Sequence, residues 1–237
     1  MKNICFLLIL SFLCVSGCVQ VTKDGKPINS NNESVAVDNE LSKVLNSYKG
    51  EYAELKSEKT AEIVQEIMNG NISTIKMVLD KPNDFEPPVL FAYSEQVFNA
   101  GQKEVGMFWY YTAQLRARSD ANKSLDKSVQ DAVTKLSQNF GSQIGAYALA
   151  NLDKLEKVMD KVIEWDKTSE RNYNPKWVAI LGDDAKFSDK IRFKPEKDYQ
   201  LINTKVREGW TVGFKNALKQ LKEEQRKLMN DYRLFNR

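Results

Sequence analysis

Histidine is absent from this 237-residue chain, and cysteine is scarce. Without histidine, the chain lacks the side chain that most often acts as a general base or a metal ligand near neutral pH. The three cysteines are Cys5, Cys14 and Cys18, all near the N-terminus. Glycine-rich phosphate loops, Gly-x-Ser-x-Gly elbows and paired Asp-x-Asp calcium loops are also missing. We therefore expect no metal site, no cofactor and no catalytic residue.

An excess of one charge is missing as well. The chain has 35 Lys and Arg against 32 Asp and Glu, a formal net charge of +3. Charges of both signs are mixed along the chain, which is not the footprint of a nucleic-acid-binding protein. The adjacent acids Asp183-Asp184 and Glu223-Glu224 could serve a carboxylate-only enzyme, but such pairs in a lysine-rich chain are typical of a solvated surface. The sequence predicts a protein that is not an enzyme and does not bind nucleic acid.

The N-terminus carries an apolar run from Ile4 to Val15, with Lys2 before it and Ser16-Gly17 after it. This order is typical of a secretory signal peptide. The run is too short for a comfortable membrane span, which needs about 20 apolar residues. We therefore predict that residues 1–17 are a signal peptide.

The segment Val15-Ser16-Gly17-Cys18 resembles the lipobox of bacterial lipoproteins. The resemblance implies cleavage before Cys18 and attachment of diacylglycerol and further acyl chains such as palmitate there, which leaves no free thiol. Residue 19 is Val rather than Asp, which by resemblance to enterobacterial sorting implies the outer membrane, facing the periplasm. The alternative is a plain signal peptide followed by a chance cysteine.

The remainder divides into a tether and a helical body. Residues 18–37 are mostly polar and include Gly, Pro, Ser and Asn, which indicates a flexible tether behind the lipidated cysteine. From Asp38, apolar residues recur every three or four positions, and alternating strand patterns are almost missing. We predict one α-helical domain over residues 38–237, either a bundle or a short superhelix of helical hairpins. Its first helix is predicted to run from Asp38 through Gly50 to residue 55 and beyond.

The most informative stretch lies between Pro87-Pro88 and residue 118, where two helices are predicted over 88–100 and 103–118. Gly101 suits the left-handed cap between them, and Gly106 allows close helix approach. The spacing resembles a tetratricopeptide or Sel-like hairpin, which implies that five residues pack the two helices together: Gly101, Gly106, Trp109, Tyr110 and Ala113. Coincidental packing of aromatic residues is the alternative, because no second copy is found at the period of the repeat.

Further helices are predicted after residue 122. One is expected to end at Gly141, another to begin after Asn151, and the last to start at Pro195 and to bend or divide at Gly209 and Gly213. Residues 168–194 are the least regular stretch, and long irregular loops are often functional. Within it, Tyr173 and Trp177 are candidates for an exposed contact, with burial against the core as the alternative.

These observations predict a lipid-anchored periplasmic protein whose body binds another protein, as a scaffold or as an immunity protein against a toxin that acts in the periplasm. The immunity role is implied only by resemblance to Sel-like lipoproteins with such roles. The alternatives are a cell-envelope enzyme that uses carboxylates on peptidoglycan or glycans, and a purely structural lipoprotein that makes contacts through its terminal helix. The identity of the partner and the oligomeric state are left open.

Overall fold

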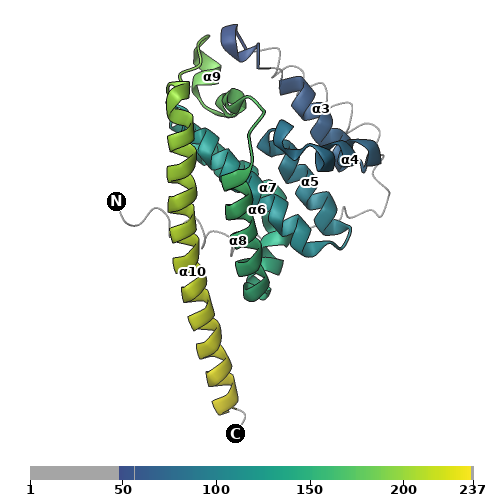
Figure 1. Ribbon diagram of the computed structural model, residues 1–237, viewed down its shortest axis with the longest axis vertical. Coiled ribbons are helices and arrows are strands. Elements are labelled where there is room, and N and C mark those ends of the chain that lie inside the picture. Colours follow the sequence, from purple (N-terminus) through teal and green to yellow (C-terminus); the bar gives the residue numbers. More distant parts are fainter. Residues whose placement is uncertain (1–47, 56, 236–237) are drawn as a thin grey trace, which may run out of the picture.

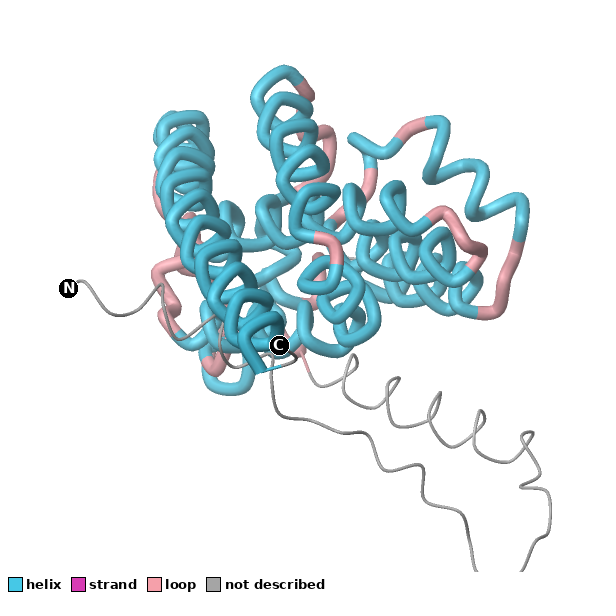
Figure 2. The backbone as a smooth tube through the Cα atoms, turned by 90° about the horizontal axis from the view of Figure 1, so that it is seen from below, coloured by secondary structure: helices cyan, strands magenta, loops and turns pink. Residues whose placement is uncertain are grey.

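The structure, a computed structural model, describes residues 48–55 and 57–235, and within them the chain is all-α. Figure 2 shows helices joined by short loops, and the only β-type pairing in this part is an isolated bridge between Ser124 and Phe193. The α-helices are α3 (Ser57–Met68), α4 (Ile72–Asp80), α5 (Pro87–Asn99), α6 (Lys103–Ala121), α7 (Ser128–Ala150), α8 (Leu152–Thr168), α9 (Asp184–Phe187) and α10 (Tyr199–Phe235). The prediction of an all-α fold is confirmed.

Helix α6 is the centre of the bundle. It packs against α5, α7, α8 and α10, and against η4 (Pro175–Leu181), a 3-10 segment (Figure 1). Most of its apolar side chains are therefore excluded from water, as expected for a helix enclosed by others. The fully buried apolar residues of α6 are Met107, Tyr110, Ala113, Leu115, Ala117 and Ala121.

The α5–α6 hairpin forms almost where the sequence predicts it. Gly101 has a φ of 91°, a conformation that side-chain-bearing residues rarely adopt. A Cβ atom on Gly106 would lie 2.5 Å from the Cβ of Phe98, so only glycine allows the two helices to approach this closely. Trp109, Tyr110 and Ala113 follow on α6 and are buried. These residues therefore lie at the centre of the core.

Helix α7 differs from the prediction, because it continues through Gly141 as one helix of 23 residues. Gly141 does not end a helix; it is buried against the phenol of Tyr110, which occupies the space beside its Cα. Similarly, Gly209 and Gly213 lie within α10, which is continuous over 37 residues. In both helices the surrounding packing and the neighbouring helix-forming residues outweigh the low helix propensity of glycine.

The helix predicted through residue 55 is also corrected. Residues 50–52 form a short 3-10 segment, η2 (Gly50–Tyr52), and α3 begins only at Ser57. Gly50 has a φ of 54°, and a Cβ there would clash with the backbone of Asp189. The predicted signal peptide, Cys18, the tether and the first part of that helix lie outside the described residues. No helix in the described part of the chain has the length and apolar composition needed to cross a membrane.

Candidate binding pocket beside a buried ion network

Two carboxylates are buried where α6, α8 and α10 meet. The side chains of Asp120, on α6, and Asp166, on α8, have no exposed surface. Asp120 Oδ1 lies 2.7 Å from Lys123 Nζ, and Asp166 Oδ1 lies 2.7 Å from Arg171 Nη2. Arg171 Nη1 is also 3.7 Å from Asp120, so this guanidinium bridges the two acids. Since a buried charge without a partner is very costly, these ion pairs fix the local arrangement of the helices.

Helix α10 and the centre of α6 each add an arginine to this cluster. Arg207 Nη1, on α10, lies 2.9 Å from Asp166 Oδ2. Arg116 on α6 is fully buried, and its Nε lies 3.7 Å from Asp166 Oδ1. We call these six residues the ion network: Arg116, Asp120, Lys123, Asp166, Arg171 and Arg207.

Arg116 is the most deeply buried cation of the network. Its Nη2 atom donates hydrogen bonds to Asn83 Oδ1 and to the carbonyl of Glu170, and its guanidinium lies 4.3 Å above the Trp165 ring. The Nε and Nη1 atoms are buried without a hydrogen-bond partner. Burial away from water lowers the pKa of Arg116.

Tyr173 and Trp177 are buried, so the hypothesis of an exposed contact is wrong and the alternative, burial against the core, is confirmed. Their exposed fractions are only 9% and 3%. The Tyr173 hydroxyl and the Trp177 indole N–H donate hydrogen bonds of 3.0 and 2.9 Å to Asp120 Oδ2. A buried carboxylate oxygen requires hydrogen-bond donors, and these two hydrogen bonds to Asp120 therefore hold both rings in the core.

A cavity of about 590 Å³ opens beside the ion network. Its lining comes from the end of α6, the end of α8, the loop that follows α8, and the first turns of α10. Buried Lys123 and the largely buried Arg171 and Arg207 contribute cationic groups, while exposed Lys167 and Gln200 lie where the cavity meets solvent. The lining is therefore mainly polar and is rich in hydrogen-bond donors.

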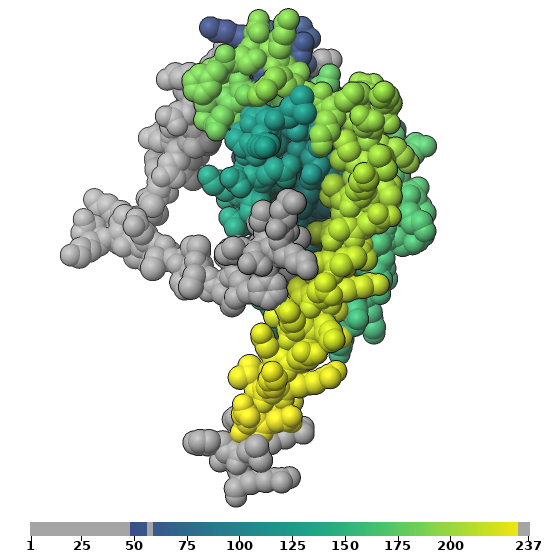
Figure 3. All heavy atoms as spheres, turned by 90° about the vertical axis from the view of Figure 1, so that its left-hand side faces the viewer, coloured from purple at the N-terminus to yellow at the C-terminus, as the bar shows by residue number. Residues whose placement is uncertain are grey.

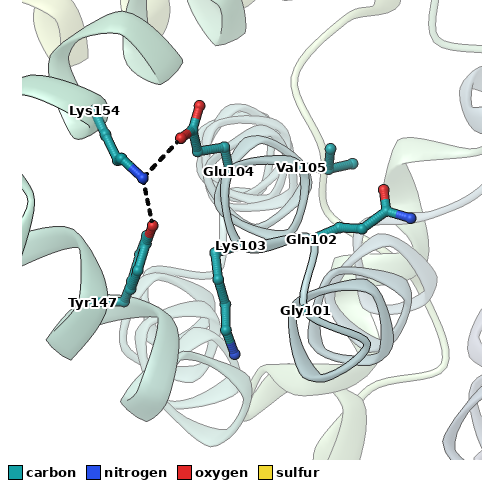
Figure 4. Close-up of a pocket in the computed structure, with 7 residues that line it drawn as sticks. All are labelled: Gly101, Gln102, Lys103, Glu104, Val105, Tyr147 and Lys154. Atoms are coloured by element: carbon teal, nitrogen blue, oxygen red, sulfur yellow. Dashed lines mark hydrogen bonds and ion pairs between the residues drawn. The ribbon is translucent and has the colours of Figure 1, made fainter.

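A second, shallower hollow of about 360 Å³ lies at the turn of the α5–α6 hairpin (Figure 4). Lys154 points between Tyr147 and Glu104, at 3.0 and 3.1 Å from their oxygen atoms. The side chains of Lys154 and Glu104 are about half exposed, 48% and 53%, and such surface ion pairs contribute little to stability. This hollow has no buried polar group in its lining, and the pocket beside the ion network is the better candidate site.

The acid pairs singled out from the sequence do not come together. Asp183 pairs with Lys186, and Asp184 pairs with Arg192, at the surface near α9. Glu223 and Glu224 are exposed on α10. Within the described residues, no three acidic side chains gather as a set of metal ligands.

The ion network is not among the sites that the sequence predicts, because the predicted acid pairs were adjacent in the sequence and its two acids are not. The signal was present, however, because Arg116 and Asp120 stand four residues apart on a helix whose other positions are mostly apolar or aromatic. Charged residues on a helix that is enclosed on all sides must be paired inside the protein. Asp166, the ion-pair partner of Arg116, lies on α8, and Arg171, which approaches Asp120, lies in the loop after α8, so neither can be found from spacing alone.

Comparison with known proteins gives limited guidance. No family model matches the chain, and no solved structure matches it significantly. An uncharacterized protein of Haemophilus influenzae is 26% identical over 168 residues, which cover 69% of this chain and 64% of that protein. The chain therefore spans less than two thirds of this relative.

Proposed function

We propose that this chain is a lipoprotein of the bacterial cell envelope, anchored through Cys18 to the outer membrane and facing the periplasm, whose helical body is a non-catalytic module that binds a protein partner. The lipobox-like segment Val15–Cys18 supports the anchor. The observation that carries the binding role is the free C-terminal part of α10.

The described contacts of helix α10 with α6 and α8 lie along its first two thirds. Leu218 is buried, Leu221 is partly buried against the core, and Lys222 forms ion pairs with Asp153 and Glu156 on α8. Beyond this point every residue from 223 to 231 is exposed. Figure 3 shows α10 as a ridge that runs along the body and continues past its lower end, where it is drawn in yellow. The last 13 residues of the helix correspond to about 20 Å of length.

This projecting segment is suited to protein contact. Leu228 and Met229 are 71% and 55% exposed, and Leu228 follows Leu221 by seven residues, on the same face of the helix. Glu223 precedes Lys227 by four residues, the spacing and order that stabilise a solvated helix. A helix of a partner protein could pack against Leu228 and Met229. It would continue the row of apolar contacts that α10 makes with the body at Leu218 and Leu221.

The state of the buried acids favours binding over catalysis. A general base must reach the proton that it removes. The side chains of Asp120 and Asp166 have no exposed surface, and all four of their oxygens already accept hydrogen bonds from cations or aromatic donors. Although these two acids approach one cavity, as a carboxylate enzyme requires, their burial and their ion pairs support the non-catalytic role.

Site-specific photocrosslinking in the lipidated full chain tests this function. A photoreactive residue at position 228 or 229 should yield one discrete crosslink to a different protein, whereas the same residue at Leu201 or Val212, exposed apolar positions of α10 beside the body, should not. A crosslink to a second copy only, equal yields at all four positions, or no crosslink would reject the partner-binding role. The identity of the captured protein separates a scaffold from an immunity protein.

The anchor has its own test. Labelled palmitate should be incorporated into the unaltered chain and not into a Cys18→Ala variant, which should accumulate as the unprocessed precursor. Release of the unaltered chain from membranes in detergent-free buffer would reject the anchor without affecting the partner-binding role.

A further inference from the structure

The ion network contains more buried positive charge than buried negative charge. Four cations, Arg116, Lys123, Arg171 and Arg207, have side chains that are 0%, 3%, 11% and 15% exposed. They face two carboxylates, Asp120 and Asp166. Within the described residues no other carboxylate lies within 4.0 Å of any of these four groups. The network therefore holds two positive charges in excess.

The nearest other acids do not remove this excess. Glu170 lines the cavity, but it is exposed, as is Lys167 in the same lining, and it forms no ion pair with the four cations. Asp84 is exposed and accepts its hydrogen bond from Asn172 rather than from a cation. Glu86 accepts a hydrogen bond from Thr60 and does not line the cavity. Because uncompensated buried charge is unfavourable, an anion in the adjacent cavity would stabilise the network.

Unused hydrogen-bond donors lie in or next to the cavity. Lys123 carries three N–H donors, of which one is directed to Asp120, and its Nζ lies 5.1 Å from the centre of the Tyr199 ring. The Tyr199 hydroxyl is buried without a hydrogen-bond partner, and Tyr199 is one of the residues that line the cavity. Arg116 has two buried nitrogen atoms without a hydrogen-bond partner, but it does not line the cavity and would act on a ligand there only through its charge. Buried polar groups rarely stay unpaired in folded proteins, so the remaining donors of Lys123 and Tyr199 point to a missing acceptor.

We propose that this cavity is a binding site for a small dianionic ligand whose oxygen atoms are those of a phosphate or of carboxylates. Oxyanions fit the donors present, since guanidinium, ammonium and phenol groups all donate to such oxygens, and two negative charges balance the excess of the network. The volume of about 590 Å³ accommodates a small metabolite rather than a bare ion alone. This site is separate from the projecting part of α10, so the proposal of an anion site does not depend on the proposed protein partner.

Calorimetric titration of the full mature chain in detergent at pH 7 tests the proposal, with sodium phosphate and sodium succinate as probes and sodium chloride at equal ionic strength as the control. Saturable binding of phosphate or succinate, accompanied by a rise in unfolding temperature, is expected. Chloride should give neither effect. Preference for phosphate or for succinate then identifies which of the two chemical groups the natural ligand carries.

Tyr199→Phe is the informative variant, because it removes only the unpaired hydroxyl and leaves the ion pairs of the network intact. Affinity should fall roughly tenfold, as expected for the loss of one hydrogen bond to an anion. Tyr147→Phe, which removes a tyrosine hydroxyl from the shallow hollow, is the matched control and should bind like the unaltered chain. The proposal is overturned if neither probe binds, if chloride has the same effect, or if Tyr199→Phe binds as tightly as Tyr147→Phe.

Discussion

The phenol of Tyr110 lies directly against the backbone of Gly141, in the space that any side chain at position 141 would occupy. Its hydroxyl donates to the carbonyl of Ser137, 3.1 Å away, and accepts from Gln114 Nε2. One ring therefore joins α6 to α7 by close packing and by hydrogen bonds. Burial raises the pKa of Tyr110 to about 12, so the hydroxyl stays protonated and remains a donor at physiological pH.

Gly141→Ala should destabilise the fold. The new Cβ would displace the Tyr110 ring, and overpacking of this kind typically costs about 1–3 kcal/mol, offset in part by the better helix propensity of alanine. We expect a net loss of about 1–2 kcal/mol in the free energy of unfolding, measured by urea titration. Gly209→Ala is the matched control, because a Cβ there meets no atom within 4 Å, and it should be neutral or stabilising. Equal effects of the two substitutions would contradict this account.

Gly141 and Gly50 also illustrate what the sequence could and could not predict. Periodic apolar spacing located most of the helices, including both members of the α5–α6 hairpin to within a few residues. It could not tell that Gly141 continues a helix, because the reason lies on another helix, in the ring of Tyr110. The same holds for Gly50, whose contact is Asp189, far away in the chain. Local apolar patterns therefore predict that helices form, whereas contacts between residues far apart in the chain decide where the helices end.

The candidate site was less predictable for the same reason. Tyr173 and Trp177 stand in an irregular stretch, where the sequence left both exposure and burial against the core open. Their burial depends on Asp120, more than 50 residues earlier, which needs two neutral donors in addition to its cation. No spacing within residues 168–194 contains that information.

Asp166→Asn should destabilise the protein strongly. The amide cannot balance the charges of Arg171, Arg207 and Arg116, and breaking a buried ion pair from one side typically costs about 3–5 kcal/mol. Asp183→Asn, at an exposed ion pair with Lys186, should leave the midpoint of denaturation nearly unchanged. Similar midpoints for the two variants would show that the ion network contributes little to the stability of the fold.

Stability should fall as pH rises through the range in which Glu86 titrates. Burial is the main cause that raises the pKa of Glu86 from 4.5 to about 7, and the nearby charge of Asp120 raises it further, against the hydrogen bond from Thr60. The folded protein then binds more protons than the unfolded chain between these values, so the stabilisation is complete below pH 4.5 and lost above pH 7.

Glu86→Gln tests this relationship, since glutamine keeps an acceptor for Thr60 without the charge. We expect the variant to be more stable than the unaltered chain at pH 8 by roughly 2 kcal/mol, and the difference to shrink toward pH 4.5. Thermal unfolding over this pH range measures it. Glu164→Gln, at an exposed position of α8, serves as the control and should show no such trend. A pH-independent difference for Glu86→Gln would contradict the assignment.

Removal of residues 223–237 should leave the body folded and equally stable. Residues 223–231 are all exposed, and among the side chains of α10 that the structure describes, the last ones that join the core are Leu218 and Leu221. Surface segments without core contacts change the free energy of unfolding by less than about 0.5 kcal/mol, whereas Leu218→Ala would create a cavity and cost about 3 kcal/mol. Denaturant titration should therefore show a normal stability for the truncated chain and a reduced stability for Leu218→Ala. Partner binding should show the opposite pattern. It should be lost on truncation and retained in Leu218→Ala, measured at a temperature where that variant is folded. A truncated chain that unfolds like Leu218→Ala would mean that the projecting segment belongs to the body, and the case for a partner at the end of α10 would then fail.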